Sequence, residues 1–385
     1  MKALTARPAL RWAVPLVVIA SLLAGGIALA TRSDSASPSL PPRTAEQLLA
    51  DIHQAEVPGL SGTVVSTARL GLPALPSPGG REGASLSGLV AGSHTIRVWY
   101  AGKDRARLAL TGTLAESDAI RNGQDLWLYQ SADNSVTHVR LPAGAAGERS
   151  LEGQGGAAAA LAPQEAARRF VAAITPTTTV QVERTARVAG RDVYQLRLRP
   201  KDPRSLIDSA VLAVDGRTHV PLQVQVLAKG SAAPAFETGF TDVQFRVPSA
   251  DVFAFTPPPG AKVTERSLRE LSRAESEAQA LDRALLAGSQ PAVLGTSWTT
   301  VLVLRDIQPG APASGGRDAG NLLNGLLQAA TPVHGAFGHG RLVRTALVTA
   351  LLTDDGRLYV GAVTPAAIEA AAAQPLSAAR PLTGR

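Results

Sequence analysis

The sequence of 385 residues contains no cysteine. This absence excludes disulfide bonds, zinc sites built from thiolates and thiol-based catalysis. It also excludes the acylated cysteine through which a bacterial lipoprotein is held on a membrane. Any attachment to a membrane must therefore come from the polypeptide itself.

Recognisable catalytic patterns are absent as well. The chain has no G-x-S-x-G, no H-E-x-x-H and no Walker-type G-x-x-x-x-G-K, and no G-x-G-x-x-G opens a strand-helix unit. Asp354 and Asp355 suggest paired carboxylates, but their D-D-G context is typical of a solvated hairpin turn. Because no nucleophile or acid-base set converges, we expect no enzyme, no catalytic residues and no cofactor.

Histidine is scarce, with six residues in the chain. Only His334 and His339 lie close together, in the Gly-rich segment VHGAFGHGR. A structural zinc normally takes four ligands, and no further ligand is near in the sequence. We therefore expect a surface loop here and no metal site.

The positive charge has no arrangement suited to nucleic acid. The formal net charge is +7, and five of the 38 basic residues are lysines. This bias toward Arg, together with abundant Ala, suits a high-GC genome, and no basic run is interleaved with aromatic residues. We expect no nucleic-acid partner, although the charge favours an anionic membrane surface.

The N-terminal 30 residues have the pattern of an export signal. Basic residues precede the apolar run Ala13 to Ala30, which ends in Ala28-Leu-Ala30. This A-x-A site predicts a cleaved signal peptide with Thr31 as the mature N-terminus, whereas the length of the run also suits an uncleaved membrane anchor. Both alternatives place the rest of the chain outside the cytoplasm, in the cell envelope or secreted. Residues 31–43 form a Ser/Pro-rich linker.

The middle of the chain alternates with a period of two, as strands do. Ile120 to Leu141 predicts two strands around the polar turn Gln130 to Ser135, and Leu126 to Tyr129 is apolar on both faces, which favours the middle of a sheet covered on each side. We also predict strands over His94 to Tyr100, over Arg105 to Thr111, and repeatedly from Thr177 onward. Helices are predicted after the cap Thr44 and over Pro163 to Ile174.

About ten antiparallel strands with two helices, and no parallel crossover units, predict an α+β protein with one large curved sheet. The apolar concave face of such a sheet must be covered by the helices or by a ligand.

The Asn122-Gly123 turn, the LWLY strand, the polar turn and the following V-T strand resemble the lipoprotein carrier LolA and its relatives. These include LolB, the LppX group and the N-terminal domain of RseB/MucB. The helix before Leu60-Ser-Gly-Thr63 and the segment Phe253-Ala-Phe-Thr-Pro-Pro-Pro-Gly260 resemble the family's first and last elements. The resemblance covers Ala45 to Val263 and implies a half-open barrel with lid helices over an apolar cavity, in an actinobacterial-type member with a C-terminal extension.

Residues 264–385 are expected to form a small α+β accessory domain, and residues 44–263 the lipid-binding domain. The predicted elements are an amphipathic helix over Ser267 to Ala287, a strand over Thr299 to Leu304, a helix over Asn321 to Ala329, a hairpin of Arg341 to Leu352 with Arg357 to Val363, and a last helix after Thr364-Pro365. The stiff Pro257 to Gly260 should hold this domain beside the barrel. Its strand carrying Arg341 and Arg344 combines cations with apolar residues, as a protein-binding edge does.

The resemblance implies transport of lipid or acylated lipoprotein by an exported or membrane-anchored carrier. Acyl binding requires only an apolar wall, since each methylene removed from water contributes about 0.8 kcal/mol. The alternative is a regulator similar to RseB/MucB that senses lipid or lipoprotein and contacts a membrane-bound partner. Trp99, Trp127 and Tyr129 are expected near the cavity or in the core. The predicted lipid-binding residues are Leu108, Leu110, Leu126, Leu128, Leu196, Leu198, Val224 and Val226. A shift of the strand register by one residue would place the predicted residues of that strand on the other face of the sheet.

Overall fold

The computed structural model describes residues 40–71, 92–112, 116–141, 163–267, 291–307, 330–375, 377 and 379–381. The export segment predicted over residues 1–30 lies outside these ranges, and so do the predicted helix over Asn321 to Ala329 and all but the first residue of the amphipathic helix predicted from Ser267. In the part of the chain that is described, no helix has both the length and the apolar character needed to cross a bilayer.

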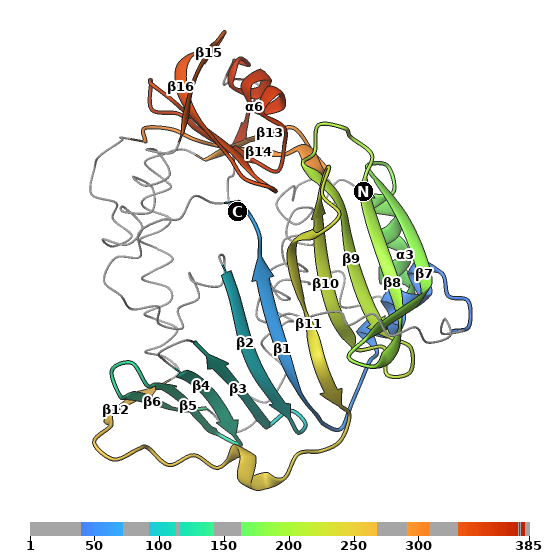
Figure 1. Cartoon of the computed structure of the whole chain (residues 1–385), viewed down its shortest axis with the longest axis vertical. Coiled ribbons are helices and arrows are strands. Elements are labelled where there is room, and N and C mark those ends of the chain that lie inside the picture. Colours follow the sequence, from blue (N-terminus) through green and yellow to red (C-terminus); the bar gives the residue numbers. More distant parts are fainter. Residues whose placement is uncertain are drawn as a thin grey trace, which may run out of the picture.

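Two sheets form the molecule (Figure 1). The larger has twelve strands in the order β12-β6-β5-β4-β3-β2-β1-β11-β10-β9-β8-β7, and the smaller has seven in the order β15-β16-β17-β18-β14-β13-β19. The strands of the larger sheet are β1 (Leu60–Ala68), β2 (Gly92–Tyr100), β3 (Arg105–Thr111), β4 (Glu116–Asn122), β5 (Asp125–Gln130), β6 (Ser135–Arg140), β7 (Thr178–Val188), β8 (Arg191–Pro200), β9 (Ile207–Asp215), β10 (Pro221–Ala228), β11 (Pro234–Gln244) and β12 (Lys262–Ser267). Those of the smaller are β13 (Ala292–Leu294), β14 (Val301–Leu304), β15 (Thr331–Gly335), β16 (Gly338–Arg344), β17 (Thr349–Thr353), β18 (Leu358–Gly361) and β19 (Arg380–Pro381).

The larger sheet is antiparallel with one exception. β12 pairs with β6 in parallel, from Lys262 opposite Ser135 to Ser267 opposite Arg140. The prediction of a wholly antiparallel sheet is therefore wrong at this edge. The parallel pair arises because β11 and β6 run in the same direction, and the chain after β11 passes through the 3₁₀ helix η3 (Ala250–Phe253) to the end of the sheet at which β6 begins.

The three predicted helices that lie in the described ranges are confirmed. α2 (Ala45–His53) begins at a capping box, in which the Thr44 hydroxyl accepts from the Gln47 N–H and the Gln47 side chain accepts from the Thr44 N–H. α3 (Pro163–Ile174) has proline in its first turn, and its C-terminal end leads directly into β7 (Figure 1). α6 (Pro365–Ala372) follows Thr364 and packs on the smaller sheet through the buried Ile368.

The meander β4-β5-β6 agrees with the predicted strands and turns. Gly123 has a φ of +64°, a conformation that glycine adopts without strain, and it stands in the tight turn between β4 and β5. β5 is hydrogen-bonded on both sides, but it is the third strand from the edge. Leu128 on this strand is 36% exposed, so the expectation that both of its faces are covered is wrong.

The two faces of the larger sheet are covered by different segments. We call the face that α2 contacts the helix face; there Leu48 packs against Tyr194, Leu196 and Val214. The opposite face, which we call the loop face, is covered by residues 245–255, from Phe245 over Ala213 to Phe255 over Trp127. Along each strand, alternate side chains thus project from the helix face and from the loop face.

The smaller sheet departs from prediction in two places. A turn closed by the Thr345 N–H donating to the Val348 carbonyl separates β16 from β17, so Arg341 to Leu352 is not one strand. His334 and His339 lie opposite each other in the hairpin of β15 and β16, with ring centroids 6.4 Å apart, and so do not form a surface loop. The hairpin turn at Asp354-Asp355-Gly356 is confirmed.

The smaller sheet docks on one end of the larger. Val226 and Phe236 of the larger sheet pack against Trp298 and Leu347 of the C-terminal part. Backbone hydrogen bonds run from the Leu206 N–H to the Ala362 carbonyl (2.9 Å) and from the Ala346 N–H to the Leu70 carbonyl (2.7 Å). These contacts hold the C-terminal part against the large sheet, whereas the stiff segment Pro257 to Gly260 leads into β12 of the large sheet itself.

Candidate functional site

The eight apolar residues predicted to bind lipid all project from the helix face. In one half of the sheet, Leu108 lies opposite Ala119 and Ala119 opposite Leu128. In the other half, Leu196 lies opposite Leu212 and Leu212 opposite Val224. Because directly opposite residues share a face, and residues two apart on a strand do too, the same parity holds for Leu110, Leu126, Leu198 and Val226.

The eight residues divide into a covered and an open group. Over β8 to β10 the helix face is closed: Leu196 is 2% exposed beneath Leu48 of α2, and Val224 and Val226 are also buried. These side chains form core, and no ligand reaches Leu196 unless α2 moves. The half of the sheet nearest β7 therefore does not offer these residues to a ligand directly.

Over β3 to β5, and at Val98 of β2, the same face is more exposed, whereas Ile96 of β2 is 5% exposed. We define the open patch by Val98, Leu108, Leu110, Ala119, Leu126 and Leu128. Leu108 is 43% exposed and Leu128 36%, while the other four side chains are half-buried. The apolar cluster under α2 includes none of these residues. Exposed leucines on interior strands of a sheet are the feature that marks this patch.

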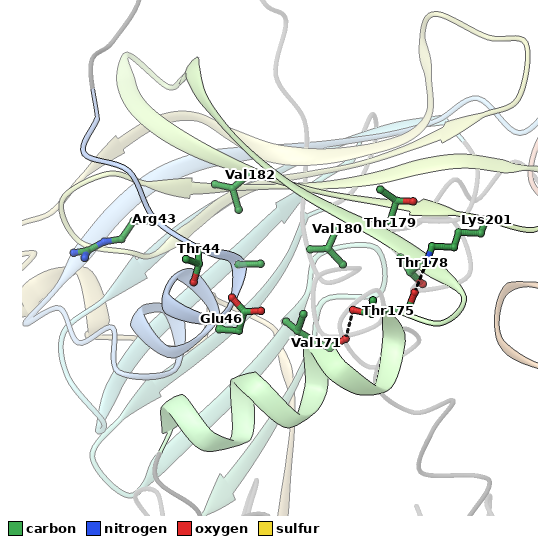
Figure 2. A pocket seen from close by; sticks show the side chains of 11 residues that line it. Arg43, Thr44, Glu46, Val171, Thr175, Thr178, Thr179, Val180, Val182 and Lys201 are labelled. Carbon is green, nitrogen blue, oxygen red and sulfur yellow. Dashed lines mark hydrogen bonds between the residues drawn. The ribbon is translucent and has the colours of Figure 1, made fainter.

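A pocket of about 620 Å³ lies beside the covered half, between α2, α3 and the edge strand β7 (Figure 2). Its apolar wall is formed by Val171 of α3 and by Val180 and Val182 of β7, which project from the helix face. The complete lining is Arg43, Thr44, Ala45, Glu46, Val171, Thr175, Thr178, Thr179, Val180, Val182 and Lys201. None of the eight predicted residues is in it, although the alternation of Val180 and Val182 was a sequence signal for this wall.

Charged side chains stand at the rim of this pocket. Lys201 Nζ donates to the Thr175 carbonyl over 2.6 Å, at the end of α3 (Figure 2). Arg43 Nε lies 3.3 Å from Asp51 Oδ2 on α2. Glu46 adds a carboxylate in the first turn of α2. The pocket thus combines an apolar wall with a polar rim.

The pocket is also linked to the C-terminal part. The buried Thr178 accepts a hydrogen bond from Trp298 Nε1 over 2.8 Å, and its neighbour Thr177 is 2.7 Å from the Ser297 hydroxyl. Thr178 therefore lines the pocket and contacts the second sheet at the same time.

The aromatic residues expected near a cavity lie on the loop face. Arg97 and Arg107 place their guanidinium carbons 5.1 and 5.5 Å from the Trp99 ring. Trp127 stacks on His138 and meets Phe255, with centroid distances of 3.8 and 5.5 Å. These contacts agree with packing in the core, the second of the two expected placements, and Tyr129, whose ring lies 6.1 Å from Phe255, belongs to the same packing. None of the three residues lines the pocket.

A buried ion pair supports this loop face beneath the open patch. Arg107 Nη2 donates to Asp118 Oδ2 over 2.6 Å, and the Asp118 side chain is almost fully buried. Arg107 also donates to the Val252 carbonyl over 3.3 Å, which fastens the returning segment to β3. The open patch therefore lies on strands that are held firmly from behind.

In the described ranges, no three His, Asp or Glu side chains come together as a metal site would require. His334 and His339 have no third ligand from this set nearby.

No protein-family model and no curated protein matches the sequence. Among solved structures, MucB in complex with MucA(peri) shares 15% identity, with 89% of this chain and 100% of that chain covered and a TM-score of 0.41. The MucA/MucB complex of Pseudomonas aeruginosa shares 16%, with 88% and 99% covered and a TM-score of 0.40. A LolA superfamily protein from Nitrosomonas europaea shares 16%, with 56% and 99% covered and a TM-score of 0.21. Scores this low do not assign a function.

Proposed function

We propose that the protein is a carrier that binds acyl chains on the helix face of its large sheet, over the open patch. The observation that carries this proposal is the exposure of Leu108 and Leu128 on β3 and β5, the interior strands on either side of β4, where a sheet normally buries leucine. Water contacts apolar side chains there at a free-energy cost that an acyl chain would remove.

The expected affinity suits reversible transport. Each methylene that leaves water contributes about 0.8 kcal/mol, so a chain that lies along half its length on the patch gains several kcal/mol. No covalent step or cofactor is needed. The pocket beside α2 and α3 has the size of a small-molecule site and an apolar wall, so it is the second place where part of a ligand fits.

The other expectations remain part of this proposal. The strands and the helices α2 and α3 represent a half-open barrel with its lid, and residues 44–263 and 264–385 the lipid-binding and accessory domains. Export through residues 1–30, cleaved or retained as an anchor, gives the carrier access to lipid or acylated lipoprotein in the cell envelope. The positive net charge favours an anionic membrane surface.

A regulator that senses lipid is the second candidate. One observation favours it: Thr178 lines the pocket and accepts the hydrogen bond of Trp298. A ligand that displaces Thr178 would alter the docking of the C-terminal part, and with it a protein-binding edge near Arg341 and Arg344. Such a ligand shifts partner binding only if its affinity differs between the two states.

Binding of a fluorescent fatty acid, cis-parinaric acid, to the full-length protein tests the carrier proposal. Leu128→Arg should weaken binding at least about tenfold, because an acyl chain cannot solvate the guanidinium that would replace the leucine. Thr111→Arg is the matched control, since it adds the same charge at an exposed position of β3 on the loop face. Equal affinity of wild type and Leu128→Arg would contradict the proposal, as would equal losses in the two variants.

A further inference from the structure

β12 is the least supported strand of the large sheet. It is an edge strand, its pairing with β6 is parallel, and all of its side chains except that of Thr264 are exposed. Val263, its one large apolar residue, is 45% exposed. Little hydrophobic burial therefore holds this strand, and side-chain contacts to β6 matter more for it than for an interior strand.

One side-chain contact stands out. His138 of β6 is buried, and both of its ring nitrogens meet carboxylates. Nδ1 lies 2.8 Å from Glu265 Oε2 on β12, and Nε2 lies 2.8 Å from Asp125 Oδ1 on β5. His138 thus connects three adjacent strands across the edge of the sheet.

Only the protonated ring satisfies this geometry. A neutral imidazole carries one N–H, so one of the two carboxylates would face the lone pair of the other nitrogen. The imidazolium donates to both. Its charge is also favoured by Trp127, whose ring stacks at 3.8 Å with an interplanar angle of 10°.

The charged groups around His138 support the same protonation state. Burial lowers the pKa of His138, but the hydrogen bonds and charges of Glu265 and Asp125 outweigh burial and raise the pKa above its ordinary value. Arg140 on the same strand lies 3.8 Å from Asp125, is largely exposed, and opposes this rise weakly through that carboxylate.

We propose that His138 is a pH-sensitive clamp that holds β12 on β6 while protonated and releases it on deprotonation. A raised folded-state pKa means that the clamp is fully present below the ordinary histidine pKa of about 6.5 and is lost as the pH rises through the folded value.

Fluorescence of Trp127 reports the protonation directly, since a stacked imidazolium quenches an indole. The emission of Trp127 is obtained by subtracting the spectrum of the Trp127→Phe variant from that of the full-length wild type. It should rise with pH, with a midpoint above about 6.5, the ordinary pKa of histidine. Glu265→Gln should move this midpoint to lower pH. An unchanged midpoint in Glu265→Gln would overturn the proposal.

Hydrogen exchange of residues 262–267 tests release of the strand. Exchange rates are divided by the intrinsic rate at each pH to give protection factors. As the pH rises through the same midpoint, the protection factor of residues 262–267 should fall by about tenfold for each unit by which docking of β12 raises the pKa of His138. Glu265→Gln should abolish this pH dependence. Asp125→Asn removes the carboxylate that is not on β12, so protection should still depend on pH, but with a lower midpoint. Protection in β8 should stay constant. Protection of 262–267 that does not change with pH would also overturn the proposal.

Discussion

The two halves of the large sheet carry the same alternation of apolar residues on the helix face but differ in what covers it. Over β8 and β9 the face is closed by α2, and Leu196 is 2% exposed, while Val226 of β10 packs against Trp298 and Leu347 of the C-terminal part. Over β3 and β5 the equivalent positions Leu108 and Leu128 are 43% and 36% exposed. The first half is a core that stabilises the fold, and the second is apolar surface that a ligand can use.

The opposite face differs as well. Behind the open patch, the returning segment buries Phe253 completely and packs Phe255 on Trp127. The strands of the open half are therefore stabilised on their loop face, which leaves their helix face free to bind. A sheet with one supported and one open face keeps its shape whether or not a ligand is present.

Truncation of a leucine in each half should give the largest contrast. Leu196→Ala leaves a cavity beneath Leu48, and we expect a loss of about 2–5 kcal/mol in the free energy of unfolding. Leu108→Ala removes a side chain that is 43% exposed, and should cost less than about 1 kcal/mol. Urea denaturation of both variants measures the difference. Equal losses would show that the open patch is core as well.

Removal of Arg107 tests the support behind the open patch. Arg107→Met leaves the buried Asp118 without its cation, which should cost about 3 kcal/mol, at the low end for such pairs because Arg107 is partly exposed. The double variant Arg107→Met/Asp118→Asn should recover part of this loss, since it removes the unpaired charge. If Arg107→Met alone is neutral in urea denaturation, the loop face does not hold this half.

The covered half should respond to acid through Asp215. Burial raises the pKa of Asp215, but hydrogen bonds from Arg191, Thr218 and Arg217 outweigh burial and lower the pKa below its ordinary value. A lowered pKa stabilises the fold above the unfolded value of about 3.9 and ceases to do so as the pH falls through the folded value. Asp215→Asn should therefore lose about 1–3 kcal/mol at pH 7.

This difference between wild type and Asp215→Asn should shrink as the pH is lowered below about 4. Urea denaturation of wild type and Asp215→Asn at pH values from about 3 to about 7 measures this difference in stability. A difference that stays constant over the whole range would mean that Asp215 contributes no pH-dependent stability.

Strand positions and face parity were predictable from sequence, because alternation has a period of two and Gly-containing turns separate the runs. All eight predicted residues share a face for this reason. Which part of the helix face is covered was not predictable. The strands that carry Leu196 and Leu128 have the same alternation of apolar residues, and only the position of α2 makes Leu196 part of the core. The break between β16 and β17 was not predicted because Thr345 to Val348 contains neither glycine nor proline. Its turn depends on two hydrogen bonds: the Thr345 N–H donates to the Val348 carbonyl, and the Thr345 hydroxyl accepts from the Val348 N–H.

The pocket was not predicted from the sequence either, because it depends on how distant segments are arranged. Its lining comes from α2, α3, β7 and Lys201, which are far apart in the chain, and no single segment among them carries a motif. The same holds for His138, whose two carboxylates come from β5 and from β12, the strand whose parallel pairing the sequence did not indicate. Sites assembled from distant segments require the topology first.

Photolabelling tests the central claim most directly. The full-length protein would be irradiated with a fatty acid that carries a diazirine near the end of its chain, and labelled residues located by mass spectrometry, with excess unlabelled fatty acid as competitor. We predict competed labels at Leu108, Leu128 and their neighbours in the open patch, and none at Trp99 or Trp127 on the loop face. Labels confined to the loop face or to the C-terminal sheet, or no competed label at all, would contradict an acyl-binding surface on the open half of the sheet.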